Sequence, residues 1–287
     1  MSVDVEDYFM VEAFSENVSR ASWPARPSRV VDSTRRVLDL LDIYDAKATF
    51  FFVGWIADRF PQLVRDVHSR GHELACHSYW HRTVYSLSPQ EFREDTRIAV
   101  RAIENAGSVR VQGYRAPSWS ITKDSLWALD ILAEEGFTYD SSIYPIYHDL
   151  YGVPGAQRFP YELKCRNGLQ LKEYPPATVR LFGQNLPAAG GGYLRIFPLA
   201  YTRWAFHKFE NCYRDSLVVY VHPWELDPEQ PRLSQGLKSR LRHYTCLRQM
   251  RSKLEYVLRN HSFRSFESVN KRVSDALAVS VALCDQQ

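Results

Sequence analysis

Short apolar segments alternate with amphipathic segments along this 287-residue chain, and this alternation limits the fold more than any other feature. Residues 48–54 (ATFFFVG) are typical of a buried β-strand, whereas residues 29–44 repeat apolar side chains every three to four positions, as a helix does. Strands that alternate with helices form parallel sheets or barrels. We therefore expect an α/β fold built on a parallel sheet or barrel.

The clearest expected helix spans residues 88–107. Ser88 is a suitable N-cap, Pro89 is a suitable first residue, and Glu91 completes a capping box with Ser88. Gly107 then marks the end of the helix. Further helices are expected at 61–71, 122–136 and 198–212, further strands at 2–5, 72–76, 111–117, 137–140, 169–176 and 216–225, and a glycine-rich loop at 188–195.

Composition and charge exclude several classes of protein. Hydrophobic residues make up 45% of the chain, enough for a large core, and the net charge of +3 gives no reason to expect nucleic-acid binding. The sequence has no run of 18 apolar residues, and its acidic N-terminus does not resemble a secretory signal, so we expect a cytoplasmic protein. The five cysteines are widely spaced without a CxxC pair, as reduced thiols are, and Cys76 is expected to lie in the core.

Several expected strands end in titratable side chains. In parallel β/α barrels the functional residues gather at the carboxyl ends of the strands, so these positions are candidates for a site. Each one alone could be a turn residue, a helix cap or a satisfied structural group. Together on one rim, however, they favour a functional site. These strand ends carry Asp4, Glu6 and Asp7, then His77, Arg115, Asp140 and His222.

His77 and His81 lie four residues apart and are candidate metal ligands. At this spacing they could share one face of a helix. Two imidazoles and a carboxylate from the first strand would form a facial site for a divalent cation, with open positions for water. A second carboxylate could then take a proton from that water, and a separate histidine could protonate a leaving group. This set of groups suits the hydrolysis of an amide or an ester.

Five short motifs occur in a fixed order: DVED at 4–7, HSYWH at 77–81, RAPS at 115–118, DSSIY at 140–144 and YVH at 220–222. In these motifs and their order the chain resembles the polysaccharide deacetylases of the NodB-homology type, carbohydrate esterase family 4. The likeness looks closest to the exosortase-associated deacetylases of exopolysaccharide loci, through the segments SVDVEDYF, GGGYLRIFP and HPWELDPEQPR.

The resemblance implies a fold and a reaction. The fold is a distorted (β/α) barrel, with a catalytic domain at residues 1–227 and a C-terminal extension at residues 228–287 packed on it. The reaction is metal-dependent removal of N-acetyl groups from hexosamine residues of a polysaccharide or its lipid-linked precursor, in exopolysaccharide biosynthesis. The expected metal is Zn²⁺, with Co²⁺, Ni²⁺ and Fe²⁺ as alternatives that the same ligands accept.

The resemblance also implies roles on the metal side of the site. His77 and His81 would be metal ligands, and Asp4 would be the general base that deprotonates the metal-bound water. The third ligand stays open. The family pattern of two adjacent aspartates, base then ligand, favours Asp7, whereas strand alternation places Glu6 on the same face as Asp4. A less favoured arrangement makes Glu6 and Asp7 the base and the ligand, with Asp4 in a supporting role.

On the acid side of the site, the resemblance implies three further roles. Arg115 would hold the base through a charge-assisted hydrogen bond. His222 would be the general acid for the leaving amine. Asp140 would orient His222 and raise its pKa.

The substrate side is expected to be an N-acetylated glycan or a lipid-linked oligosaccharide. Trp224 and Tyr193 are candidates for stacking against sugar rings, and Arg195 is a candidate for contact with an anionic group. Residues 232–264 contain nine Lys or Arg residues and one Glu. Such a run is usually a solvated face, and the functional alternative is peripheral contact with lipid phosphates at the inner membrane.

Two other functions fit part of the same pattern. One is an amidohydrolase of the same fold that acts on a small ureide or cyclic imide, although such relatives often lose part of the metal set and this chain keeps both histidines. The other is an inactive glycan-binding homologue, which would be expected to lack the base or the acid. Asp4 and His222 are both present.

Overall fold

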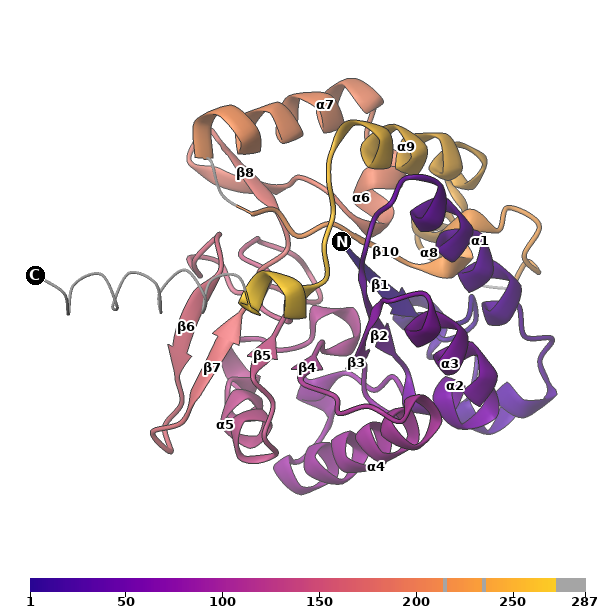
Figure 1. Cartoon of the computed structure of the whole chain (residues 1–287), viewed down its shortest axis with the longest axis vertical. Coiled ribbons are helices and arrows are strands. Elements are labelled where there is room, and N and C mark those ends of the chain that lie inside the picture. Colours follow the sequence, from indigo (N-terminus) through magenta and orange to yellow (C-terminus); the bar gives the residue numbers. More distant parts are fainter. Residues whose placement is uncertain (214–215, 234–235, 272–287) are drawn as a thin grey trace, which may run out of the picture.

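An eight-stranded sheet forms the centre of the molecule in the computed structural model, which describes residues 1–213, 216–233 and 236–271 (Figure 1). The strand order is β10-β1-β2-β3-β4-β5-β7-β6, and every neighbouring pair is parallel except β6 and β7. The expected parallel α/β architecture, a distorted barrel, is therefore confirmed. The strands are β1 Ser2–Val5, β2 Thr49–Phe52, β3 Glu73–Cys76, β4 Gly113–Tyr114, β5 Tyr139–Asp140, β6 Tyr161–Lys164, β7 Gln170–Glu173 and β10 Tyr220–Val221.

Helices surround this sheet. Figure 1 shows α2, α3 and α4 side by side on one flank, and α7 with α9 at the opposite end. The larger helices are α1 Val30–Ile43, α2 Gly54–Arg59, α3 Pro61–Ser69, α4 Pro89–Gly107, α5 Trp127–Glu134, α6 Gly191–Ile196, α7 Leu199–Lys208, α8 Leu237–Tyr244 and α9 Leu247–Asn260. A separate antiparallel hairpin joins β8 Thr178–Leu181 to β9 Gln184–Pro187.

Helix α4 forms as its sequence predicts. The Ser88 hydroxyl accepts the backbone N–H of Glu91, and the Glu91 carboxylate accepts the backbone N–H of Ser88, which confirms the capping box. Gly107 is the last residue of the helix rather than a residue beyond it. A Cβ at Gly107 would lie 2.5 Å from Leu74 Cδ1, so glycine lets the helix pack closely on β3 with the Leu74 side chain in its present position.

Some expected elements differ in extent. The strands expected at 111–117 and 216–225 each contain only two residues with strand pairing. The loop expected at 188–195 is partly helical, because α6 begins at Gly191. A Cβ at Gly190 would lie 2.2 Å from the Tyr220 ring, so the glycines here allow the chain to approach β10 closely before the helix starts. The β8–β9 hairpin was not expected.

The C-terminal residues pack directly on the sheet. Helix α9 contacts α6, and Phe266 stacks on Tyr174 with ring centroids 4.8 Å apart. The division into domains at residue 227 stays a prediction, and residues 272–287 of the expected extension lie outside the described residues. Cys76 is buried, as expected. Within the described ranges, the structure has no helix that is both long enough and apolar enough to cross a bilayer.

Candidate active site

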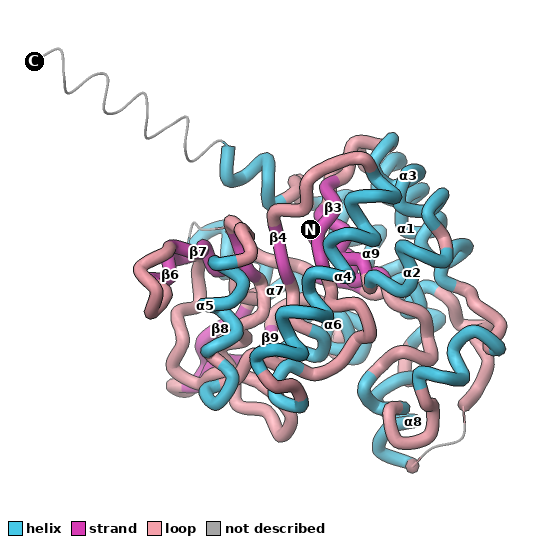
Figure 2. Tube along the Cα trace, turned by 90° about the horizontal axis from the view of Figure 1, so that it is seen from below, coloured by secondary structure: helices cyan, strands magenta, loops and turns pink. Residues whose placement is uncertain are grey.

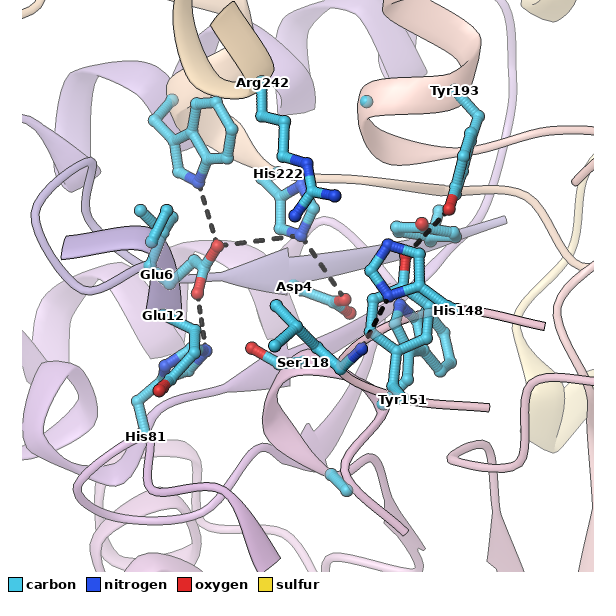
Figure 3. A pocket seen from close by; sticks show the side chains of 18 of the residues that line it. Asp4, Glu6, Glu12, His81, Ser118, His148, Tyr151, Tyr193, His222 and Arg242 are labelled. Carbon is cyan, nitrogen blue, oxygen red and sulfur yellow. Dashed lines mark hydrogen bonds and ion pairs between the residues drawn. The ribbon is translucent and has the colours of Figure 1, made fainter. Parts of the chain in front are cut away.

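The carboxyl ends of several parallel strands meet at one edge of the sheet and line a cavity of about 500 Å³ (Figure 3). Asp4 lies within β1, His77 follows β3, and His222 follows β10. The strands are parallel and in register from Ser2 opposite Tyr220 to Phe52 opposite Cys76, so their ends fall at the same level. This register brings together residues far apart in the sequence, as the strand-end argument predicts.

Glu6, His77 and His81 form a compact group of potential metal ligands. One ligand atom from each lies within 4.8 Å of the others, and all three side chains are buried. The two histidines lie in a loop after β3 rather than on a helical face, which corrects that expectation. His81 has a positive φ of 49°, a conformation uncommon for residues other than glycine, and the loop thereby turns the second imidazole back toward the first.

The hydrogen bonds around these ligands fit a divalent cation. His77 Nδ1 lies 2.7 Å from the carbonyl oxygen of Arg115, so Nδ1 carries the proton and Nε2 is left to bind a metal. His81 Nε2 lies 2.6 Å from Glu6 Oε2, while His81 Nδ1 is buried without a partner. Two imidazoles and one carboxylate form a donor set that binds Zn²⁺ and related ions. The residues present therefore fit the metal that the motifs imply.

The charges of these groups follow from their surroundings. Burial lowers the pKa of His77 to about 4, which keeps the imidazole neutral, as a metal ligand must be. Burial alone would raise the pKa of Glu6, but His81 and His222 outweigh that effect and bring it well below its usual range. Glu6 is therefore ionised, and the group presents one negative charge to a cation.

Asp7 lies outside the group of ligands and serves a structural purpose. Its carboxylate accepts the backbone N–H groups of Arg29 at 3.0 Å and Val30 at 3.3 Å, together with the Ser28 hydroxyl at 2.5 Å. These N–H groups belong to the first turn of α1, where no intrahelical acceptor exists. Of the two expected third ligands, the structure thus favours Glu6 and assigns Asp7 to the start of a helix.

Asp4 and Arg115 form a buried ion pair. Arg115 Nη1 donates to Asp4 Oδ1 at 2.6 Å and to Ser2 Oγ at 2.8 Å, while Nη2 donates to Ser141 Oγ at 2.8 Å. The guanidinium also lies over the Phe51 ring, 4.2 Å from its centroid. Arg115 therefore holds Oδ1 of Asp4 in place, while Asp4 itself lines the cavity.

His222 lies on the opposite side of the cavity from the metal ligands' loop. Its Nε2 lies 3.6 Å from Glu6 Oε1 and 3.9 Å from Asp4 Oδ2, and its Nδ1 lies 3.1 Å from Glu225 Oε2. Burial alone would lower the pKa of His222, but Glu6, Glu225 and Asp4 raise it to about 9. A protonated imidazole here can donate a proton to a leaving group at neutral pH.

The expected contact between Asp140 and His222 is replaced by another pair. Asp140 accepts the Ser142 hydroxyl at 2.6 Å and lies opposite Glu173 in the register of β5 and β7. Burial raises the pKa of Asp140 to about 6, and burial together with the charge of Asp140 raises the pKa of Glu173 well above its usual value. Glu225 occupies the position beside His222. Glu225 was not among the residues predicted from the sequence, although the His-x-x-Glu spacing of a capping box marks it.

The expected substrate-binding residues divide into two groups. Tyr193 and Trp224 line the cavity, as expected. Arg195 does not, because it is buried against Glu225 at 3.0 Å, and its role in contacting an anionic substrate group is therefore corrected. Other segments contribute wall residues that were not predicted from the sequence, among them His148, Tyr151 and Arg242. Figure 3 shows Tyr151, Tyr193 and His148 grouped on one side of the cavity and Arg242 above it.

Two family models match consecutive parts of the chain. Residues 24–139 match the model described as "Polysaccharide deacetylase", and residues 141–271 match a "Domain of unknown function (DUF3473)". The first match includes His77, His81 and Arg115, and the second includes His222 and Glu225. The candidate site therefore draws on both matched regions.

Curated relatives match about a third of the chain. The chain is 33% identical over 101 residues to a chitooligosaccharide deacetylase of Bradyrhizobium sp., covering 35% of this chain and 43% of that protein. It is 27% identical over 101 residues to a peptidoglycan-N-acetylglucosamine deacetylase of Bacillus cereus, covering 35% and 37%. It is 32% identical over 100 residues to a bifunctional xylanase/deacetylase of Pseudobutyrivibrio xylanivorans, covering 34% and 17%. The chain thus spans less than half the length of these relatives.

Solved structures share the fold at low identity. A Mycobacterium smegmatis protein provisionally described as a polysaccharide deacetylase has a TM-score of 0.59 and 22% identity, covering 96% of this chain and 89% of that one. The PuuE allantoinase has a TM-score of 0.57 and 17% identity, covering 94% and 87%. These two likenesses concern the fold alone. The polysaccharide deacetylase model and the curated deacetylase relatives each match only part of the chain, and in that part the chain is similar to polysaccharide deacetylases, as its motifs predict.

Proposed function

We propose that this chain is a metal-dependent hydrolase that removes N-acetyl groups from hexosamine residues of a glycan, within exopolysaccharide biosynthesis. One observation carries the proposal: a single cavity holds a set of metal ligands, a carboxylate base and a histidine acid. The deacetylase relatives support the same reaction. Zn²⁺ is the proposed metal, with Co²⁺, Ni²⁺ or Fe²⁺ as alternatives for the same ligands.

The residues around the cavity divide the chemistry among them. Glu6, His77 and His81 would hold a divalent cation, which would supply Lewis-acid chemistry to the acyl group and the attacking water. Asp4 takes the proton of the attacking water. Arg115 holds one oxygen of the Asp4 carboxylate in place and so orients this base. The remaining step is protonation of the leaving nitrogen of the amide by a residue on the acid side of the cavity.

His222 carries out that protonation. Its Nε2 lies within 4 Å of Asp4 Oδ2, so an acyl carbon attacked beside Asp4 has its nitrogen within reach of His222. Water adds to the acyl carbon, the carbon–nitrogen bond breaks, and the nitrogen leaves as an amine with the His222 proton. The products are acetate and a free amino sugar.

The wall opposite the metal ligands fits a sugar ring. Tyr151 and Tyr193 share a hydrogen bond between their hydroxyl groups at 2.9 Å, and the His148 ring stacks on Tyr151 at 3.7 Å. Trp224 adds an indole ring beside His222. Aromatic faces with polar tips present both apolar area and hydrogen-bonding groups, as the two faces and hydroxyl groups of a sugar require.

Acetate release tests this proposal directly. Wild-type protein is incubated with N-acetylglucosamine oligomers and Zn²⁺ or Co²⁺, beside chelator-treated protein and an Asp4→Asn variant. We expect metal-dependent release that the variant loses. Release of product from a ureide or cyclic imide instead would favour the amidohydrolase alternative, and metal binding without turnover on any of these substrates would favour an inactive glycan-binding protein.

We also propose that a lipid-linked oligosaccharide is a substrate and that the chain contacts the cytoplasmic face of the inner membrane. The basic run 232–264 supports this only in part, because Lys253 turns inward and donates to the carbonyls of Arg195 and Phe197. Exposed apolar side chains give further support. The described chain has nine exposed large apolar residues. Five of them lie on segments that contribute to the walls of the cavity or of a neighbouring pocket: Tyr147, Leu150, Phe182, Ile196 and Leu241.

These five residues lie on the β8–β9 hairpin, α6, α8 and the loop before residue 152; Figure 2 shows β8, β9 and α6 in the lower central part of the view, with α8 apart from them. Phe182, at the tip of the hairpin, is 95% exposed. Flotation with anionic phospholipid vesicles at low salt tests the contact. We expect Phe182→Ser to weaken flotation and Ile43→Ser, an exposed control on α1, to leave it unchanged. Absence of flotation for the wild-type protein would remove the membrane proposal without affecting the deacetylase proposal.

A further inference from the structure

The orientation of His222 depends on the partner of its second ring nitrogen. A general acid must present its donor atom to the leaving group, and Nε2 is the nitrogen of His222 that faces the cavity. The hydrogen bond at Nδ1 sets the ring orientation, and in the neutral imidazole it also sets which nitrogen keeps a proton. The group that contacts Nδ1 therefore decides whether His222 can act as an acid.

Glu225 is that group, and it holds His222 at two points. Its Oε2 lies 3.1 Å from Nδ1 and also accepts the backbone N–H of His222 at 3.1 Å. Because one carboxylate oxygen binds both the ring and the backbone of the same residue, it fixes the ring relative to the chain. Trp224 lies almost parallel to the ring at 18°, with centroids 5.2 Å apart, and limits its rotation.

Arg195 keeps Glu225 in its charged and oriented form. Glu225 is fully buried, and a buried carboxylate is stable only when it is paired. Arg195 Nε donates to Glu225 Oε1 at 3.0 Å, and the guanidinium is itself buried. Burial alone would raise the pKa of Glu225, but His222 and Arg195 outweigh that effect and lower it. The two carboxylate oxygens thus have different partners, one on the guanidinium and one on the imidazole.

The C-terminal segment, residues 236–271, completes the arrangement. Arg195 Nη2 donates to the carbonyl of Arg242 at 2.7 Å, and Nη1 donates to the carbonyl of Thr245. Both carbonyls lie at the end of α8, where the last turn of a helix leaves carbonyl groups without intrahelical partners. Lys253, on α9, donates in turn to the Arg195 carbonyl at 2.7 Å. Every nitrogen of the guanidinium therefore has an acceptor, and two of the three are in this segment.

We propose that Glu225, held by Arg195, is a positioning residue for the general acid His222, and that residues 236–271 take part in catalysis by fixing Arg195. The proposal rests on the proposed function, because it assumes an amide whose nitrogen must be protonated to leave. In that step the Nε2–H bond breaks and the proton bonds to the leaving nitrogen, which takes the electron pair of the carbon–nitrogen bond. His222 becomes neutral and keeps its Nδ1 proton, directed at Glu225.

Comparison of an amide with an activated ester tests the proposal. The nitrophenolate of 4-nitrophenyl acetate leaves without protonation, so its hydrolysis does not need the acid. For Glu225→Gln we expect kcat/KM on N-acetylglucosamine oligomers to fall about 10- to 100-fold, as when the partner of a functional histidine is lost. On the ester we expect a change below about threefold, because general-acid help adds little to a good leaving group. His222→Ala should show the same selectivity with a larger loss on the amide.

A matched control separates positioning from general damage. Glu173→Gln alters another fully buried glutamate, away from His222, and should leave the amide-to-ester ratio of kcat/KM unchanged. An equal loss on both substrates with Glu225→Gln would make Glu225 a purely structural residue, and no loss on the amide would also overturn the proposal. If Glu225→Gln fails to fold, the double variant Glu225→Gln/Arg195→Met removes both buried charges together, and the same selectivity is expected.

A second readout does not depend on turnover. In wild-type protein without metal, proton NMR should show a downfield Nδ1–H signal for His222, which moves upfield or disappears in Glu225→Gln and persists in Glu173→Gln. A wild-type signal that Glu225→Gln leaves in place would overturn the proposal. If wild-type protein releases no acetate from any N-acetylated sugar, the proposed function fails, while this signal still decides whether Glu225 positions the ring.

Discussion

Glu6 and Asp7 are adjacent carboxylates for which the structure predicts opposite behaviour toward metal. Glu6 lies 2.6 Å from His81 Nε2 within the ligand group, whereas Asp7 accepts N–H groups at the start of α1. The variants Glu6→Gln and Asp7→Asn each replace one carboxylate by the amide of the same size. We expect Glu6→Gln to weaken metal binding and Asp7→Asn to leave it unchanged.

The size of the effect follows from linkage. At a free metal concentration of about 100 times Kd, binding stabilises the folded state by about 2.7 kcal/mol. If Glu6→Gln weakens binding about 100-fold, that gain falls to about 0.4 kcal/mol, a difference of about 2.3 kcal/mol. At an unfolding entropy of about 2.1 cal/mol/K per residue, the difference corresponds to about 4 °C in the metal-induced rise of Tm for this 287-residue chain.

Asp7→Asn should instead lower Tm equally with and without metal. Its cost is the loss of a negative charge at a helix N-terminus, about 0.3–1 kcal/mol. The cost is small because burial already raises the pKa of Asp7 to about 6, so the folded protein gains little from that charge. Thermal unfolding with and without Zn²⁺, together with metal content after desalting, measures both variants. Loss of the metal-induced shift in Asp7→Asn, with the shift kept in Glu6→Gln, would refute the assignment.

Three further outcomes are expected. Asp4→Asn should reduce amide hydrolysis about 10²- to 10⁴-fold. Because Arg115 loses its counter-ion in the core, the variant should also lower the free energy of unfolding, measured in urea, by about 3–5 kcal/mol. Unchanged stability would contradict the ion pair. Burial lowers the pKa of His243 to about 3, so between pH 6.5 and 3 the unfolded chain binds a proton that the folded chain does not. Stability therefore falls as pH falls, by about 2 kcal/mol at pH 5, and unfolding of His243→Asn at pH 7.5 and 5 should show a smaller loss. Gly190→Ala places a Cβ 2.2 Å from the Tyr220 ring, which should lower the free energy of unfolding by about 1–3 kcal/mol. Because Tyr220 lines the cavity, KM should also rise. An unchanged Tm would contradict this close contact.

The sequence allowed the fold and the main site residues to be predicted for a simple physical reason. Parallel strands present their carboxyl ends at one edge of a sheet, so a titratable residue at each strand end is enough to indicate a cluster. Asp4, His77, Arg115 and His222 meet in this way. The short expected strands also matched in place, since apolar runs of four to six residues reveal burial. Their hydrogen-bonded length did not match, because it depends on the neighbouring strands.

The partners of these residues could not be predicted in the same way. Asp140 and Glu225 both lie close to strand ends, and only the strand order shows that β5 is far from β10 within the sheet. Asp140 therefore lies opposite Glu173 on the adjacent β7, and Glu225 reaches His222 from the short helix that follows β10. Arg195 shows the same limitation, since a glycine-rich segment predicts a loop open to a ligand, whereas the fold buries this arginine against Glu225.

The sequence by itself determined the alternation of strands and helices, the caps of α4 and the order of residues suited to metal-assisted hydrolysis, because these depend on local periodicity and on side-chain chemistry. Only the tertiary structure decided between Glu6 and Asp7, and between Asp140 and Glu225. Each choice depends on which acceptor reaches a particular N–H group or imidazole nitrogen. That outcome is set by how the chain turns after Val5 and by where the C-terminal residues pack, and such distances between remote segments leave no pattern in the order of the residues.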